Sequence, residues 1–222
     1  MTGKEKSSNR TKAHGYGYVG ADGRKLPGVT TIAGSHYPGG IGWLGKWANK
    51  LGLDGLDYEA VLNEKGNIGT CAHYLNECFI KRETPNLTEF PPDVVEHASN
   101  SHRKFVDWHN KQTIGESVGV ELEVVDADLG VGGTMDWVVL LNGKMTIIDF
   151  KTGASIGVKE YRQMAAYQKM LQRQHGVVAE DVLLLKINYK PTGRANEKFV
   201  EDLELHWADF KSLLDIYNRG RK

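Results

Sequence analysis

The chain has 222 residues, of which 40% are hydrophobic and 25% are charged, and its formal net charge is zero. This composition is ordinary for a globular domain, and the neutral balance excludes a global basic field, so any phosphate-binding surface must be local. No apolar stretch reaches the roughly 20 residues that span a bilayer. The N-terminus also lacks the apolar core of a signal peptide, so we expect a cytoplasmic protein with no membrane partner.

The two cysteines, Cys71 and Cys78, exclude several kinds of site. If their stretch is one helix, they lie two turns apart, about 10 Å, which is too far for a disulfide bond. Two cysteines also cannot supply the four ligands of an iron–sulfur cluster or of a four-cysteine zinc site. We therefore expect two reduced cysteines, as in cytosolic proteins.

The first half of the chain is predicted to consist of loops and helices. Residues 1–14 form a polar tail that we expect to be disordered, and residues 15–40 are rich in glycine, which predicts loop with short strands. Apolar residues at helical spacing, and a proline pair suited to a first helical turn, predict the helices. These cover residues 41–51, 57–81 (interrupted near residues 66–69) and 92–112.

In the second half the apolar period changes to two, which predicts strands. The expected strands cover residues 118–126, 131–141, 144–150 and 182–189, with a weaker one at 197–204, and the expected helices cover 159–175 and 206–218. The second and third strands are apolar on both faces, so both faces should be covered. The order predicts an α/β fold: a central mixed sheet (strand–strand–strand–helix–strand) flanked by helices, after an N-terminal helical region.

The most informative segment is a predicted hairpin around Asn142-Gly143, a pair that favours a two-residue type I′ turn. Counting outward from this turn places Asp136 opposite Asp149, where two carboxylates would repel each other. Lys151 points to the same face as Asp149 because it lies two residues further along the strand. A bulge near residue 134 would slide Asp136 away from this position.

Two acids and a lysine on one face of an apolar hairpin indicate a metal site with a cationic helper. Asp136 and Asp149 suit a hard cation such as Mg²⁺ or Mn²⁺, because these ions prefer oxygen ligands. Such a cation polarises a phosphoryl oxygen and lowers the pKa of its water, while Lys151 stabilises developing charge. The alternative is that the acids are strand-end residues and Lys151 is only their salt-bridge partner.

At this point the sequence resembles a known family, the RecB-type PD-(D/E)XK nucleases. Four segments in the family's order carry the resemblance, which covers roughly residues 66–190. They are Gly-Thr-Cys-Ala-His at 69–73, Gly-Thr-Met-Asp at 133–136, Ile-Ile-Asp-Phe-Lys-Thr-Gly at 147–153, and Gln-Met-Ala-Ala-Tyr at 163–167. The resemblance implies the restriction-endonuclease-like core of this superfamily, and a metal-dependent DNA phosphodiesterase.

The resemblance also implies a role for each matching residue. Asp136 and Asp149 would be metal ligands and catalytic acids, with the backbone carbonyl of Phe150 as a further ligand. Lys151 would be the catalytic lysine, and His73 would be the additional ligand typical of the RecB-type branch.

Three further positions have open alternatives. Gln163 and Tyr167 share a helix face, and the resemblance implies that they contact the lysine or the nucleic-acid substrate; otherwise they are ordinary helix residues. Many relatives place an additional acid in the first strand of the sheet. Glu121 is a weak candidate metal ligand at this place, and Glu123 is its rival on the same face.

The implied function is an exonuclease that hydrolyses linear DNA from a free end, in phage or bacterial recombination, repair or processing. The sequence is also similar to exonucleases of mitochondrial genome maintenance. We expect one nuclease domain over residues 15–222, with a loop and helical part at 15–115, a catalytic core at 116–205 and a helix at 206–222. A recombinase or a single-strand-binding protein is a candidate partner.

Two rival functions remain at this point: a structure- or site-selective endonuclease on the same core, and a non-catalytic module that binds DNA or a recombination partner. Several cations are candidate DNA contacts, and residues 186–198 combine four of them with turn residues; the alternative is a solvated face. These cations are Lys46, Lys50, Arg103, Lys104, Lys186, Lys190, Arg194 and Lys198.

Overall fold

The computed structural model describes residues 17–35, 40–153 and 155–220, and its centre is a five-stranded mixed sheet. The strand order across the sheet is β3-β4-β5-β6-β7, with only β5 and β6 parallel to each other. The strands are β3 (Ile114–Asp126), β4 (Val131–Leu141), β5 (Lys144–Lys151), β6 (Asp181–Lys186) and β7 (Asn196–Phe199). This is the predicted α/β architecture, with three consecutive antiparallel strands at its start.

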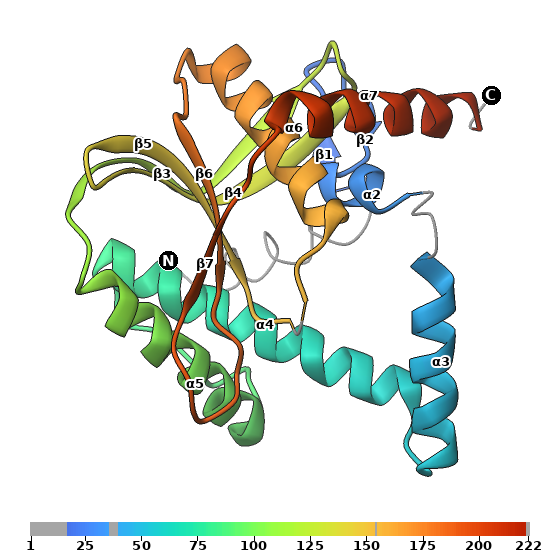
Figure 1. Ribbon diagram of the computed structural model, residues 1–222, viewed down its shortest axis with the longest axis vertical. Coiled ribbons are helices and arrows are strands. Elements are labelled where there is room, and N and C mark those ends of the chain that lie inside the picture. The colour runs from blue at the N-terminus through green and yellow to red at the C-terminus, as the bar shows by residue number, and fades with distance from the viewer. Residues whose placement is uncertain (1–16, 36–39, 154, 221–222) are drawn as a thin grey trace.

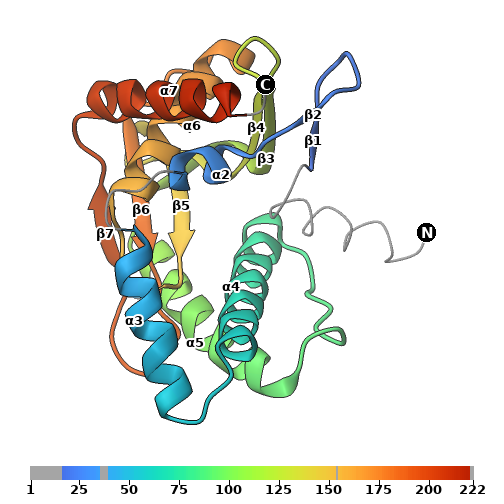
Figure 2. The same cartoon turned by 90° about the vertical axis from the view of Figure 1, so that its right-hand side faces the viewer.

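Helices cover both faces of the sheet, as Figures 1 and 2 show. The helices on one face are α2 (Val29–Gly34), α6 (Val158–His175) and α7 (Leu203–Arg219). Those on the other face are α4 (Tyr58–Lys81) and α5 (Pro92–His109). A further helix, α3 (Gly40–Leu53), precedes α4, and a small hairpin of β1 (Tyr18–Val19) and β2 (Lys25–Leu26) lies beside β4. The expectation that both faces of β4 and β5 are covered is confirmed.

The predicted turn between β4 and β5 is confirmed. Asn142 and Gly143 both have positive φ angles, 51° and 87°, as a type I′ turn requires. Leu141 pairs with Lys144, which is the predicted register. The local sequence is therefore sufficient to fix this end of the hairpin.

Helix α4 runs without a break, so the predicted interruption near residues 66–69 is wrong. Gly66 and Gly69 each lower helix propensity by about 1 kcal/mol relative to alanine. The helix nevertheless continues because buried residues on either side of Gly69, Ile68 and Cys71, pack in one apolar cluster with α5. Tertiary packing thus outweighs the local glycine penalty.

Several predicted boundaries need correction. The Gly-rich segment holds a short helix, α2, that its composition did not indicate. Strand β3 begins earlier than expected, at Ile114, and β6 ends at Lys186 rather than at residue 189. Residues 203 and 204 were expected in a strand but begin α7, and β7 already ends at Phe199 after four residues.

Other expectations concern the ends and the cysteines. Cys71 and Cys78 are buried in α4 and are not joined by a disulfide bond, as predicted. The expected polar tail at residues 1–14 lies outside the described residues. Within the described ranges, none of the helices combines the length and the apolar character that crossing a bilayer requires.

Candidate metal centre

Asp136 and Asp149 lie at the open end of the β4–β5 hairpin, where regular strand pairing stops. The ladder ends at the Trp137–Ile148 pair. One residue beyond it, Asp136 Oδ2 accepts a hydrogen bond from the backbone N–H of Phe150 at 2.6 Å. The expected direct pairing of Asp136 with Asp149 is therefore not part of the ladder, and Asp136 is tied instead to the residue that follows Asp149.

The cause is an irregularity in both β4 and its neighbour β3. Met135 and Trp137 are two residues apart but pack into the two opposite cores, whereas such residues share a face in a regular strand. Opposite them in β3, Glu121 has a φ angle of 53°, a left-handed conformation that costs a non-glycine residue about 1–2 kcal/mol. Strain of this kind concentrates at functional sites.

This irregular region meets His73, which α4 contributes from the other side. His73 Nδ1 lies 3.4 Å from Asp136 Oδ1, and the imidazole ring meets the Phe150 ring edge-on with centroids 5.8 Å apart. One ligand atom each from His73, Glu121 and Asp136 lie within 4.8 Å of one another. The structure thus brings the predicted histidine and Glu121 to Asp136, while the rival Glu123 is exposed.

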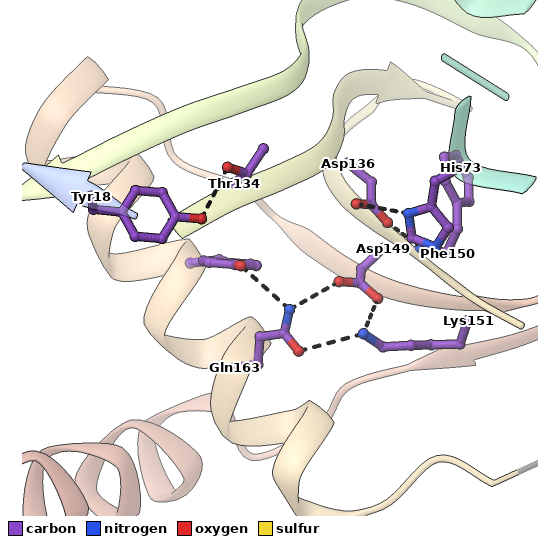
Figure 3. Close-up of polar contacts among 9 residues, drawn as sticks. Tyr18, His73, Thr134, Asp136, Asp149, Phe150, Lys151 and Gln163 are labelled. Carbon is purple, nitrogen blue, oxygen red and sulfur yellow. Dashed lines mark hydrogen bonds and ion pairs between the residues drawn. The ribbon is translucent and has the colours of Figure 1, made fainter. Parts of the chain in front are cut away.

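The second half of the centre surrounds Lys151, as Figure 3 shows. Lys151 Nζ lies 2.6 Å from Asp149 Oδ2, and it donates to Gln163 Oε1 at 3.4 Å. The amide nitrogen of Gln163 donates to Asp149 Oδ1 at 3.2 Å and to the Tyr167 hydroxyl at 3.4 Å. Gln163 and Tyr167 are both buried, 5% and 3% exposed; Gln163 holds the lysine and the acid, and Tyr167 contacts Gln163 from behind. Their contact with substrate stays a prediction.

Burial and charge set the protonation of the first half. Burial lowers the pKa of His73, but Asp136, then Glu121 and Asp149, outweigh it and raise this pKa to about 9. Burial raises the pKa of Asp136, but the charge and hydrogen bond of His73, with the charge of Lys151 and the Phe150 N–H, outweigh this effect, so the pKa of Asp136 is lowered.

The second half behaves differently. The pKa of Asp149 is raised to about 6: burial raises it most, Lys151 lowers it in part, and the nearby charge of Asp136 adds to the rise. Burial lowers the pKa of Lys151, but Asp149 and Asp136 outweigh this effect, so the pKa of Lys151 is raised. The centre thus holds three carboxylates, those of Asp136, Asp149 and Glu121, but only one lysine and one histidine. The carboxylates outnumber the cations even when His73 is protonated, and this excess of negative charge fits a bound divalent cation.

Tyr18 and Gly132 lie near the centre, and neither was identified as a site residue from the sequence. The hydroxyl of Tyr18 lies 3.1 Å from Thr134 Oγ1, two residues before Asp136 (Figure 3). The Tyr18 ring lies so close to Gly132 that a Cβ on this glycine would come within 2.3 Å of it. A glycine in a strand interior often marks such a close approach, so Gly132 was the available signal.

Gly133, the next residue, also allows an aromatic ring to approach β4 closely, but on the opposite face of the strand. A Cβ at Gly133 would lie 2.4 Å from Cε1 of Tyr167. The two glycines therefore let one aromatic ring from the N-terminal segment and one from α6 press on β4 just before Asp136.

Comparison with known proteins adds one specific finding. The family model described as the PD-(D/E)XK nuclease superfamily matches residues 62–219, more than half of the chain. Among curated proteins, none matches this sequence significantly. A solved structure titled "Crystal structure of SSO0001" is similar over 68% of this chain and 72% of that chain, with 15% sequence identity and a TM-score of 0.32. A likeness this distant carries no argument about the present chain.

Proposed function

The chain belongs to the PD-(D/E)XK nuclease superfamily, and from this premise we propose that it is a metal-dependent deoxyribonuclease that removes nucleotides from the ends of linear DNA. The observation that carries the proposal is one partly buried cluster in which a histidine from α4 meets two acids and a lysine from the hairpin. His73, 3.4 Å from Asp136, supports assignment to the RecB-type branch, and with it the preference for DNA ends.

The chemistry of the donor set supports Mg²⁺ or Mn²⁺. His73, Glu121 and Asp136 would hold the cation, with Asp149 and the Phe150 carbonyl as further candidate ligands. Carboxylate oxygens suit both ions, and the imidazole nitrogen favours the transition metal, so we expect Mn²⁺ to bind more tightly than Mg²⁺. When bound, such a cation polarises a phosphoryl oxygen and lowers the pKa of a water molecule.

The chain's own residues would supply position and charge. The Lys151 ammonium is held by Asp149 and Gln163, so its nitrogen is fixed at the edge of the cluster. From there it would donate to the phosphate oxygen on which charge develops, or orient the attacking water. Gln163 is a positioning residue in this scheme, since it bonds both the lysine and the acid.

The test is digestion of end-labelled linear DNA beside a covalently closed circle, with Mg²⁺ or Mn²⁺. We expect nucleotides to be released from the linear DNA while the circle survives. Lys151→Ala should lower the rate at least about 100-fold, the scale of a lost transition-state donor, and should largely preserve DNA binding. Lys144→Ala is the matched control, because Lys144 lies on the same strand at the turn end, exposed and paired with Asp181.

Other outcomes would replace the proposal. Nicking of the closed circle would assign an endonuclease on the same core. If Mn²⁺ supports no cleavage of any DNA and Asp149→Asn changes nothing, a non-catalytic binding module becomes the correct function.

A further inference from the structure

The connection between β6 and β7, residues 187–195, is held firmly along α5 and is called the β6–β7 loop below. Figure 1 shows it descending beside this helix. The ammonium of Lys104, a residue only 4% exposed, donates to the carbonyl oxygen of Asn188 at 2.7 Å and to its side-chain oxygen at 2.9 Å. It also donates to the carbonyl oxygen of Lys190 at 2.8 Å. A buried ammonium with three oxygen acceptors fixes the backbone of this loop.

Two more contacts from α5 hold the loop and the strand after it. The rings of His97 and Tyr189 meet with centroids 5.4 Å apart. Trp108 Nε1 donates to Glu197 Oε1 at 2.6 Å, which turns this carboxylate of β7 toward the helix. The conformation of the loop is therefore set by tertiary contacts, and this also explains why β6 ends before the sequence predicts.

The loop begins beside the metal centre. Lys186, the last residue of β6, is the register partner of Lys151, and the next residue, Ile187, donates its N–H to the Lys151 carbonyl at 2.9 Å. Tyr189 packs on the cluster of α4 and α5 residues that includes Ala72, the neighbour of His73. In α/β sheets ligands bind outside the carboxyl ends of parallel strands, and β5 and β6 both end here.

The outer side of the loop is basic. Lys190 and Arg194 are exposed, and so is Arg103 on the adjoining turn of α5. Among the described residues, no carboxylate forms an ion pair with Lys190 or Arg194. Burial lowers the pKa of Lys104, and the charges of Lys190 and Arg103 lower it further, so three cations lie close together. Such clustering costs free energy that an anionic ligand would recover.

We propose that the β6–β7 loop, with Arg103, binds the phosphates of the DNA strand that continues beyond the scissile bond. Lys104 acts as a positioning residue, since it holds the loop backbone from the side of α5. The inference rests on the proposed nuclease function and deepens it, because it identifies where the substrate strand runs. Phosphate contacts of this kind fix position on the strand without reading its sequence.

The test compares DNA binding by Lys190→Ala/Arg194→Ala with binding by Lys25→Ala/Lys111→Ala, which removes two exposed cations elsewhere. Both pairs are made in the Asp149→Asn background so that the DNA is not cut. Each lost phosphate contact lowers the slope of log affinity against log salt by about 0.7 on single strands. The loop pair should therefore lower the slope by about 1.4, and the control pair should leave it unchanged.

A small substrate without flanking phosphates separates binding from chemistry. With Asp149 intact, the loop variant should show a raised KM on DNA and should lose much less of its rate on bis-p-nitrophenyl phosphate than on DNA. A salt slope equal to that of the control pair overturns the inference even where wild-type protein cleaves DNA. A lowered slope in a protein that cleaves no DNA leaves the binding surface in place and overturns only the nuclease function.

Lys104→Met tests the positioning role, because methionine fills similar space without donors. We expect trypsin to cleave faster after Arg194, which is followed by alanine. We also expect the salt slope to fall although Lys190 and Arg194 are both still present. The midpoint of thermal unfolding reports whether the fold itself has changed. An unchanged slope with an intact fold overturns the role of Lys104.

Discussion

The two ends of the β4–β5 hairpin differ sharply although the same two strands form both. At the turn end, Asn142 and Gly143 adopt the conformation that their sequence favours, and the ladder is regular. At the open end the ladder stops before Asp136, and Glu121 in the neighbouring strand adopts a left-handed conformation. The chemistry lies entirely at the irregular end.

The difference shows what holds each end in place. Asn142 forms hydrogen bonds with the backbone N–H and carbonyl of Thr113 and with the side chain of Gln112, so the turn depends on its own edge of the sheet. The open end depends on distant segments: α4 brings His73 and α6 brings Gln163. Substitutions at the open end should therefore act on activity, and those at the turn should act on stability.

The largest effect is expected for Asp136→Asn at the open end. Asparagine can still accept the Phe150 N–H but loses the charge beside His73, so turnover of linear DNA with Mn²⁺ should fall at least about 100-fold. The free energy of unfolding, measured in urea, should fall by only about 1–2 kcal/mol, because the lost ion pair with His73 is partly offset by relief of the repulsion between Asp136 and Asp149. Retained turnover would remove Asp136 from the catalytic centre.

The same substitution at Asp126 is the matched control. Asp126 is a buried acid at the far end of β3, paired with Arg173 of α6 at 2.6 Å. Because Arg173 is partly exposed, Asp126→Asn should cost only about 1–2 kcal/mol of stability. Its turnover should stay at the wild-type value, so the two variants should lose similar stability but only Asp136→Asn should lose activity.

A smaller effect distinguishes the two acids of β3. Glu121→Gln should weaken Mn²⁺ binding by about 10–100-fold in calorimetric titration, because the carboxylate of Glu121 approaches both His73 and Asp136. Glu123→Gln should leave the Mn²⁺ affinity within about 2-fold of the wild-type value, since Glu123 is exposed and outside this group. If instead only Glu123→Gln weakens Mn²⁺ binding, the additional metal-binding acid is Glu123 and not Glu121.

The same contrast explains how much the sequence could predict. The turn, the strand order and the Asp149–Lys151 pair follow from spacing along one or two strands. The position of Asp136 does not, because the break in alternation at Trp137 depends on which core each side chain enters. The approach of Tyr18 to Thr134 joins segments 116 residues apart, and only Gly132 gave a local sign of it.

The helices show the same limit in another form. Glycines at residues 66 and 69 predicted a break in α4, but packing against α5 keeps the helix whole. The β6–β7 loop was predicted as strand up to residue 189, because nothing local reveals that Lys104, 84 residues away from Asn188, captures its backbone. Both errors arise where a distant contact outweighs local preference.

The smallest effect is expected at the turn, where a substitution should change stability and leave activity unchanged. Gly143 has a φ angle of 87° and nothing lies within 4 Å of a Cβ built there, so Gly143→Ala adds backbone strain without a clash. We expect a loss of about 1–2 kcal/mol in the free energy of unfolding. Turnover below the unfolding transition should be unchanged, because the turn lies at the opposite end of the hairpin from Lys151.

Gly66→Ala supplies the control with the opposite sign. Gly66 lies in α4 with an ordinary helical φ angle, and a Cβ there also meets nothing within 4 Å. The same chemical change should therefore stabilise the protein by about 0.5–1 kcal/mol, since alanine loses less conformational entropy in a helix. If Gly143→Ala lowers turnover as strongly as it lowers stability, the two ends of the hairpin are coupled, and the site depends on the turn as well as on the distant helices.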